Sequence, residues 1–234
     1  MQLTYQERFK TLAGVFDQFT NRTLFELHSR GVFEELVSPL KVGKESNVFI
    51  AVNGKKNVIV KIYRVQNCDF KRMYKYIGGD PRYQFLNKQR RQIIFAWAQR
   101  EYKNLMRAAE RGVTVPKPLG FMNHILVEEL IGGTEPAPPV KDLPPKNPKQ
   151  FFQLVIEEMK KLYKMGLVHG DLSSFNILNY QEKPYLIDFS QATLMKHPNA
   201  EELLKRDVKN IAQFFRKLGV DAPEEELYKD VTQR

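Results

Sequence analysis

Cysteine and histidine are scarce in this sequence, with one cysteine and four histidines among 234 residues. The single thiol, Cys68, cannot form an intrachain disulfide, and the scattered histidines show no metal-ligand spacing. No run of about 18 uncharged apolar residues occurs, and residues 1–10 are polar and charged rather than signal-like. These absences exclude a disulfide scaffold and a thiolate metal site. They predict a soluble, cytoplasmic chain without a membrane partner.

Acidic residues are outnumbered, since 27 Asp and Glu face 37 Lys and Arg, for a net charge of +10. Residues 54–117 hold sixteen Lys or Arg and four acids, so this window carries +12 and the rest of the chain −2. A local positive face attracts polyanions by counterion release, and the interleaved Tyr74, Tyr76 and Phe85 offer stacking surfaces for bases. The window favours an RNA-facing surface; the alternative is an ordinary solvated face.

The most specific motif is His-Gly-Asp-Leu-Ser-Ser-Phe-Asn at residues 169–176, followed by Asp-Phe-Ser at 188–190. Transfer of a phosphoryl group from a metal-bound nucleotide needs a proton acceptor and metal-binding oxygens, and this spacing follows kinase catalytic and metal loops. The motif predicts Asp171 as the proton acceptor, with Asn176 and Asp188 as metal ligands. Asp and Asn are also common turn residues, but isolated turns do not produce this ordered set between apolar segments.

The first half of the chain has the pattern of β-strands, predicted at residues 36–42, 47–52 and 58–63 with a hairpin turn at Asn53-Gly54. The first two strands are linked by Gly-Lys-Glu-Ser-Asn at 43–47, where a glycine, a hydroxyl and free backbone N–H groups could cradle phosphates. An ordinary hairpin tip has the same composition. The link also lacks the G-x-G-x-x-G pattern of ordinary protein kinases.

Lys61 lies within a β-branched strand, where a charge is costly to bury unless it is paired. A helix is predicted over residues 90–111, and Glu101 lies on its apolar face with Trp97 and Leu105. The two residues resemble the strand Lys and helix Glu that position ATP phosphates in kinases. Snorkelling of Lys61 from an edge strand is the alternative.

The segments between and after these elements are predicted to form a loop and a hinge. Residues 67–92 are polar and basic, and are predicted as a mobile loop without a clear element. A strand at 125–131 leads into a Gly- and Pro-rich linker, which predicts a hinge where adenine bonds the backbone of Glu129 and Ile131.

Helical patterns occur at both ends of the chain. Residues 3–33 predict two short helices, and 151–165 and 199–218 predict two longer ones. Asn199 with Glu202 is a candidate N-terminal cap for the last helix.

Taken together, these motifs resemble the RIO family of atypical protein kinases, the Rio-one branch in particular, over nearly the whole chain. The resemblance rests on Gly43-Lys44-Glu45-Ser46-Asn47-Val48, Val60-Lys61-Ile62-Tyr63, Trp97-Ala98 with Glu101 and Asn104-Leu105, Val115-Pro116 with Pro118, residues 169–178, Ile187-Asp188 with Ser190-Gln191, and residues 197–208 with Phe214-Phe215.

The resemblance implies an α+β, two-lobed protein-kinase-like fold with a small β-rich N-lobe, a helical C-lobe and no activation segment. It divides the chain into a helical extension (1–35), an N-lobe (36–131, including the loop 67–92), a hinge or linker (132–148) and a C-lobe (149–234). The absence of A-P-E from the sequence agrees with the missing activation segment.

The resemblance also implies an ATP site with Mg²⁺ or Mn²⁺, and an ATP-dependent serine/threonine kinase or ATPase acting in maturation of the small ribosomal subunit and its rRNA. Asp171 and Asp188 are the implied catalytic residues, and Asp188 has a covalent aspartyl-phosphate role in the family. The implied ATP contacts are Gly43, Lys44, Glu45, Ser46, Val48, Lys61, Glu101, Glu129 and Ile131.

Two residues depart from the expected patterns. Ser173 stands where many protein kinases have a Lys that screens the γ-phosphate, and Glu128 stands where an apolar residue is usual before the hinge. A buried acid at 128 should contact the adenine amine or pair with a cation. Two other functions stay open: an aminoglycoside-type small-molecule phosphotransferase, and a non-catalytic ATP-gated assembly module.

Overall fold

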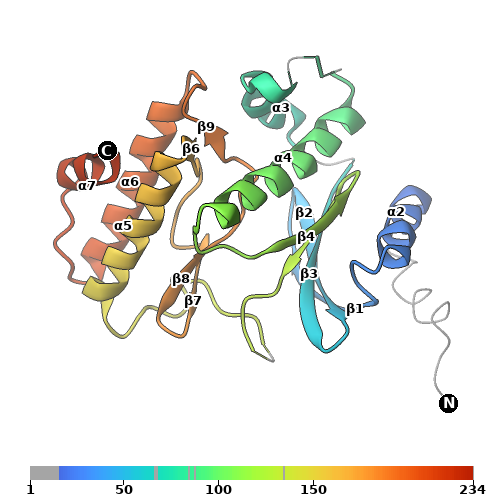
Figure 1. Ribbon diagram of the computed structural model, residues 1–234, viewed down its shortest axis with the longest axis horizontal. Coiled ribbons are helices and arrows are strands. Elements are labelled where there is room, and N and C mark those ends of the chain that lie inside the picture. Colours follow the sequence, from blue (N-terminus) through green and yellow to red (C-terminus); the bar gives the residue numbers. More distant parts are fainter. Residues whose placement is uncertain (1–15, 66–67, 84, 87, 134, 234) are drawn as a thin grey trace.

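The computed structural model describes residues 16–65, 68–83, 85–86, 88–133 and 135–233. A twisted β-sheet flanked by helices forms one part of the molecule, and three helices with two short strand pairs form the other (Figure 1). The chain passes from the first part to the second through residues 130–147.

The sheet of the first part is antiparallel, with the strand order β1-β2-β3-β5-β4. Its strands are β1 (Glu35–Val42), β2 (Ser46–Asn53), β3 (Lys56–Tyr63), β4 (Pro118–Met122) and β5 (Ile125–Glu129). The three predicted strands are confirmed within two residues, while β4 was not predicted. The β2–β3 turn is shifted by one residue, because Asn53 pairs with Lys56 and only Gly54 and Lys55 lie between them.

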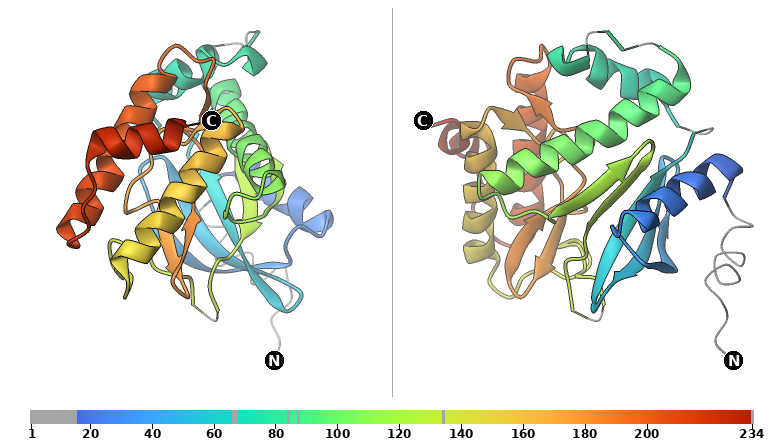
Figure 2. Two further views of the ribbon diagram at one scale, coloured as in Figure 1. Left: turned by 60° about the vertical axis from the view of Figure 1, so that its left-hand side comes forward. Right: turned by 45° about the vertical axis from the view of Figure 1, so that its right-hand side comes forward.

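Helices cover both faces of this sheet, as the two views in Figure 2 show. Alternation along β3 sends Val58, Val60 and Ile62 into an apolar cluster with α2 (Gln18–Ser29). The residues between them, including Lys61, face α4 (Arg90–Glu110). The helix predicted near residue 27 is therefore present, whereas most of the one predicted before it lies outside the described residues.

A buried histidine joins α2 to the sheet. His124, between β4 and β5, bonds the hydroxyl of Thr20 at 3.0 Å and stacks on Phe19 and Phe95. Burial, together with the charge of Arg91, lowers the pKa of His124 to about 4, although Asp17 opposes that change. The ring is therefore neutral in the folded protein.

This histidine predicts acid sensitivity. Because the folded pKa lies below the unfolded value, the unfolded chain binds more protons and stability falls as the pH drops from about 6.5 towards 4. Denaturant unfolding at pH 7 and pH 4.5 should show a loss of about 2–3 kcal/mol from this group alone. The variant His124→Gln has no titrating group at this position, so it should lose less stability between pH 7 and pH 4.5. An identical loss in both proteins would contradict the assignment.

The prediction that residues 67–92 contain no clear element was wrong, while their mobility stays a prediction. The segment contains α3 (Phe70–Gly78) and a 3-10 turn, η1 (Pro81–Tyr83). The side chain of Asp69 caps α3 by accepting from the N–H of Arg72, and Met73 and Ile77 pack against α4 in a shared core. The many basic residues hid this short apolar stripe from the sequence analysis.

The second part is built on α5 (Pro148–Lys164), α6 (Ala200–Lys217) and α7 (Glu224–Thr232), with the pairs β6 (Leu167–Val168)/β9 (Thr193–Leu194) and β7 (Ile177–Tyr180)/β8 (Lys183–Leu186). The helices share one apolar core, which includes Phe152 and Phe215. The predicted helices α5 and α6 are confirmed within three residues. The side chain of Asn199 makes no capping bond, so that prediction was wrong, and α7 was not predicted.

The connection between the two parts is extended and partly paired with the second. Ala137 donates its N–H to Ile131, and Val140 donates to Ile177 of β7. The domain boundary at 132–148 stays a prediction. None of the helices in the described ranges combines the length and apolarity needed to cross a bilayer.

Candidate active site

Side chains of helix α6 hydrogen-bond the backbone of the loop at 169–176 and fix its position. The carboxylate of Asp207 accepts from the backbone N–H of Gly170 at 2.7 Å and of Leu172 at 2.8 Å. Arg206 donates to the carbonyl of Gly170, and Asn210 donates to the carbonyl of Leu172 at 3.0 Å. Gly170 has a φ of +77°, and a Cβ there would lie 2.9 Å from the carbonyl oxygen of Gln191, so glycine is required.

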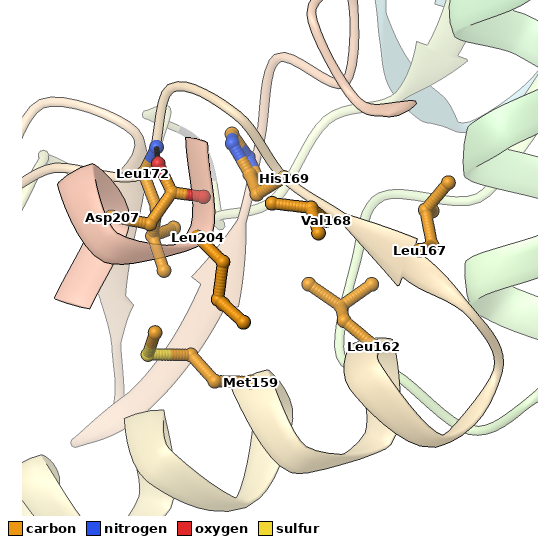
Figure 3. Close-up of a pocket in the computed structure, with 8 residues that line it drawn as sticks. All are labelled: Met159, Leu162, Leu167, Val168, His169, Leu172, Leu204 and Asp207. Carbon is orange, nitrogen blue, oxygen red and sulfur yellow. Dashed lines mark hydrogen bonds between the residues drawn. The ribbon is translucent and has the colours of Figure 1, made fainter. Parts of the chain in front are cut away.

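A small pocket lies under this loop, as Figure 3 shows. Its lining comes from α5, β6, the loop and α6: Met159, Leu162, Leu167, Val168, His169, Leu172, Leu204 and Asp207. Six of these side chains are apolar, His169 bonds the carbonyl oxygen of Ile187, and Asp207 bonds the loop backbone. The pocket therefore supports the loop by packing and offers little for a polar substrate.

Asp171 projects from the loop and is partly buried. One carboxylate oxygen accepts from the side-chain amide of Gln191 at 2.9 Å. Burial and the charge of Asp188 raise the pKa of Asp171, while the charges of Arg206 and Arg72 oppose the rise. A raised pKa makes this carboxylate a better proton acceptor.

Lys61 makes two ion pairs, one within the first part of the molecule and one that joins it to the second. Its ammonium lies 2.9 Å from the carboxylate of Glu101 on α4 and 3.1 Å from that of Asp188. The predicted Lys61–Glu101 pair is therefore confirmed, and the edge-strand alternative is wrong because β3 is the central strand. Burial lowers the pKa of Lys61, but the charges of Asp188 and Glu101 outweigh it and raise that pKa well above its ordinary value.

Asp188 itself has an unusual backbone, with a φ of +62°. Its carboxylate accepts from Lys61 and from the hydroxyl of Ser190, at 3.1 and 2.7 Å. Although burial raises the pKa of Asp188, these two partners lower it to about 2. The group is an ionised carboxylate at every physiological pH.

Asn176 lies between Asp171 and Asp188 in the sequence and bonds the backbone of Asp171. Its side-chain amide donates to the backbone carbonyl of Asp171 at 2.9 Å, which leaves its oxygen for another partner. In the described part of the chain, no three His, Cys, Asp or Glu side chains gather to hold a metal ion. One amide and one carboxylate nevertheless fit Mg²⁺, which is commonly bound by one or two carboxylates plus substrate phosphates and water.

The predicted phosphate loop is a tight turn. Gly43 donates its N–H to the carbonyl of Ser46 at 2.9 Å, and Lys44 and Glu45 form the tip between them. The carbonyl of Glu45 accepts from Arg64, which fixes the turn to the end of β3. Val48 on β2 pairs directly with Lys61, so this loop and the Lys61 ion pairs lie at the same end of the sheet.

At the predicted hinge, the N–H of Glu129 donates to the carbonyl of Lys117 and its side chain accepts from the N–H of Lys117. The carbonyl of Ile131 accepts from Ala137, whereas its N–H has no bond among the described residues. Glu128, just before it, takes part in no ion pair in the described part of the chain. The roles of the hinge and phosphate-loop residues in ATP binding stay predictions.

A buried polar network at the rear of the site was not predicted. Asp80, just after α3, pairs with Arg82 at 2.6 Å and with the fully buried Arg100 at 3.3 Å. Arg100 donates to the carbonyl of Ser190, and Asn104 donates to the carbonyl of Ala192 at 2.7 Å. The loop after Asp188 is thus tied to α4 and to the basic segment.

Sequence reasoning missed the partners that orient the predicted residues. Tyr63 donates to Glu101, Gln191 donates to Asp171, and Asp207 holds the loop backbone. These contacts join residues from distant segments. Tyr63 and Gln191 did fall within the motifs that carried the family resemblance, but the motifs alone gave them no role.

Loop 189–199 leads from Asp188 through β9 straight into α6, which leaves no separate activation segment in this described range.

Comparison with known proteins identifies the family. The RIO domain matches residues 47–228. The chain is 40% identical over 234 residues to the RIO-type serine/threonine-protein kinase Rio1 of Haloferax volcanii, covering 99% of this chain and 81% of that protein. It is 44% identical over 230 residues to Rio1 of Methanocaldococcus jannaschii, covering 97% of this chain and 79% of that protein.

A solved structure shares the fold. The Rio2 kinase–ADP/Mg²⁺–phosphoaspartate complex from Chaetomium thermophilum superposes with a TM-score of 0.69 at 26% identity, covering 92% of this chain and 67% of that one. The predicted two-lobed kinase-like α+β fold is confirmed by this similarity. The chain therefore belongs to the RIO family, whose curated members named above are serine/threonine protein kinases.

Proposed function

We propose that this chain transfers the γ-phosphoryl group of ATP, with Mg²⁺, to a serine or threonine hydroxyl of a protein. The observation that carries the proposal is the ion-pair chain Glu101–Lys61–Asp188, which lies beside Asp171. A lysine held between two carboxylates is oriented to bind phosphate oxygens, and phosphoryl transfer depends mainly on positioning and charge. The similarity to two RIO-type serine/threonine-protein kinases supports the same activity.

Asp171 acts as the proton acceptor in this proposal. The substrate hydroxyl oxygen attacks the γ-phosphorus, the bond from phosphorus to the ADP oxygen breaks, and the hydroxyl proton passes to Asp171. Gln191 fixes the carboxylate, and its raised pKa favours proton uptake. Asn176 and Asp188 would hold Mg²⁺, which when bound neutralises negative charge on the phosphate oxygens.

Transfer to Asp188 is a second candidate. An ionised carboxylate is able to attack the γ-phosphorus, which releases ADP, and water then releases phosphate and restores the carboxylate. The low pKa of Asp188 and the phosphoaspartate in the Rio2 kinase complex favour this route. The net reaction is ATP hydrolysis.

One experiment separates these activities. The protein is incubated with γ-labelled ATP and Mg²⁺, with and without an added protein substrate, and the labelled sites are mapped. Label on serine or threonine, stable to hydroxylamine, supports kinase activity, whereas hydroxylamine-sensitive label on Asp188 with free phosphate supports the hydrolytic route. ATP binding without label or phosphate release would contradict both and favour an ATP-gated assembly module.

We also propose that the partner is the immature small ribosomal subunit, in the cytoplasm. The support is the exposed basic surface around α3 and the start of α4, which we call the α3 patch. It consists of Lys71, Arg72, Lys75, Lys88, Arg90 and Arg91, with the almost fully exposed Phe85 among them. Other cations of the basic window, such as Lys61 and Arg100, are buried and paired, so the window contributes less surface charge than its sequence suggests.

The α3 patch predicts salt-sensitive binding to RNA. If all six cations contact phosphates of single-stranded RNA, affinity should fall on the order of 10²-fold between about 50 and 200 mM salt. Lys71→Glu with Lys75→Glu should weaken binding at low salt and flatten this dependence. The matched control is Lys55→Glu with Lys56→Glu, at the β2–β3 hairpin far from α3 (Figure 1). Equal losses in both variants would contradict a localised site.

A further inference from the structure

Glu128 occupies a position on β5 that faces the candidate active site. Side chains alternate along a strand, so Val127 points into the apolar cluster beneath α2 and Glu128 points the other way. Leu126 pairs with Lys61 across the ladder and lies on the same face as Glu128. The carboxyl of Glu128 therefore shares this face of the sheet with the ammonium of Lys61.

The carboxyl of Glu128 has no visible partner there. Its Oε2 is buried and has no hydrogen-bond partner among the described residues. Two donors on the same face of the sheet, Lys61 and Tyr63, already have other partners. Lys61 bonds Glu101 and Asp188, and Tyr63 donates to Glu101. Buried polar atoms are normally satisfied, so an orphaned acceptor facing a site indicates a donor supplied by a ligand.

The hinge next to Glu128 has the complementary feature. Three residues further on, the backbone N–H of Ile131 has no bond among the described residues, and a ring nitrogen of a purine can accept from it. An acceptor at 128 and a donor at 131 match the edge of adenine, which carries a donating amine at C6 beside an accepting nitrogen.

We propose that Glu128 is a specificity-determining residue whose carboxyl accepts a hydrogen bond from the 6-amino group of the nucleotide base, so that the site selects 6-amino over 6-oxo purines. A site built to bond a donor rejects an analogue that lacks it, since the buried group of the protein is then left unpaired. This inference rests on the proposed nucleotide-dependent function.

The protonation state of Glu128 refines the selection. Burial and the charge of Glu101 on α4 raise the pKa of Glu128 to about 8, with Asp188 adding to the rise and Lys61 on β3 opposing it. A protonated carboxyl is able to donate to a 6-oxo group, whereas the carboxylate only accepts. Discrimination between 6-amino and 6-oxo purines should therefore be stronger at pH 9 than at pH 6.5.

The test uses ADP and IDP, which differ only in the amine or oxo group at C6 and the proton that follows from it. Their dissociation constants with Mg²⁺ are measured by calorimetry at pH 6.5 and 9 for the wild type, Glu128→Met, Glu128→Gln and Glu110→Gln. The wild type should prefer ADP, and the preference should grow with pH. Glu128→Met should reduce the preference at least tenfold at pH 9, and neither Glu128 variant should keep the pH dependence.

Each control answers a separate question. Glu128→Gln is nearly isosteric, so it tests the proposal if the methionine variant folds poorly. Glu110→Gln changes an exposed carboxylate at the end of α4, outside the site, and should retain the wild-type ratio. An unchanged ADP-to-IDP ratio in a folded Glu128 variant would overturn this inference alone. Failure of the wild type to bind either nucleotide would overturn the proposed function with it.

Discussion

Asp171→Asn should reduce phosphoryl transfer about 10²–10⁴-fold while leaving ATP affinity nearly unchanged. Asparagine is able to keep the hydrogen bond from Gln191 and the shape of the side chain, but it cannot accept the proton of the attacking hydroxyl. Asp171 makes no ion pair in the described part of the chain, so the change leaves Lys61 and its two partners in place. The loss should therefore appear in kcat and not in the KM for ATP.

The measurement is a steady-state assay of transfer from labelled ATP, paired with calorimetric binding of ADP. Asp221→Asn is the matched control, because it makes the same substitution at an exposed position between α6 and α7. Undiminished turnover in Asp171→Asn would rule out Asp171 as the proton acceptor. A large rise in KM with unchanged kcat would indicate a binding role instead.

Asp188→Asn should lower turnover at least about 100-fold, since it removes the negative charge that would hold Mg²⁺ beside the reacting phosphate. It should also raise the Mg²⁺ concentration needed for half-maximal activity. Asparagine tolerates a positive φ better than alanine, so it isolates the loss of charge from backbone strain at +62°. Titration of activity with Mg²⁺ at saturating ATP separates the two effects.

Two further variants test whether the loss of turnover comes from the carboxylate of Asp188. Ser190→Ala removes only the hydroxyl that donates to Asp188, and should cost far less activity. Lys61→Ala leaves Asp188 in place and should act mainly by raising the KM for ATP. If Asp188→Asn responds to Mg²⁺ as the wild type does, Asp188 is not a metal ligand.

Local patterns in the sequence predicted the central parts of the fold well. Alternation marked β1, β2 and β3, and the periodicity of α4 placed Glu101 on the face that meets Lys61. Those patterns work because burial imposes a fixed period on each element. Helix α3 was missed because only Met73 and Ile77 are buried in it, too few to stand out among basic residues.

Contacts between distant segments were much less predictable. The hydrophobic period of a single segment does not predict that Asp207 on α6 accepts from Gly170, or that Arg100 on α4 donates to Ser190. Such bonds depend on how the elements pack, which single-sequence patterns do not encode. Glu128 was an exception, since an acid in an otherwise apolar strand signals an unmet polar requirement.

The proposed phosphoryl transfer requires Asp171, Asn176 and Asp188 to act on one terminal phosphate. The most direct measurement is a crystal structure with Mn²⁺ and a non-hydrolysable ATP analogue, in which anomalous scattering locates the metal. We predict Mn²⁺ bound by the side-chain oxygens of Asn176 and Asp188 and by a γ-phosphate oxygen, with Asp171 facing the γ-phosphorus. Metal elsewhere, or a γ-phosphate turned away from Asp171, would contradict it.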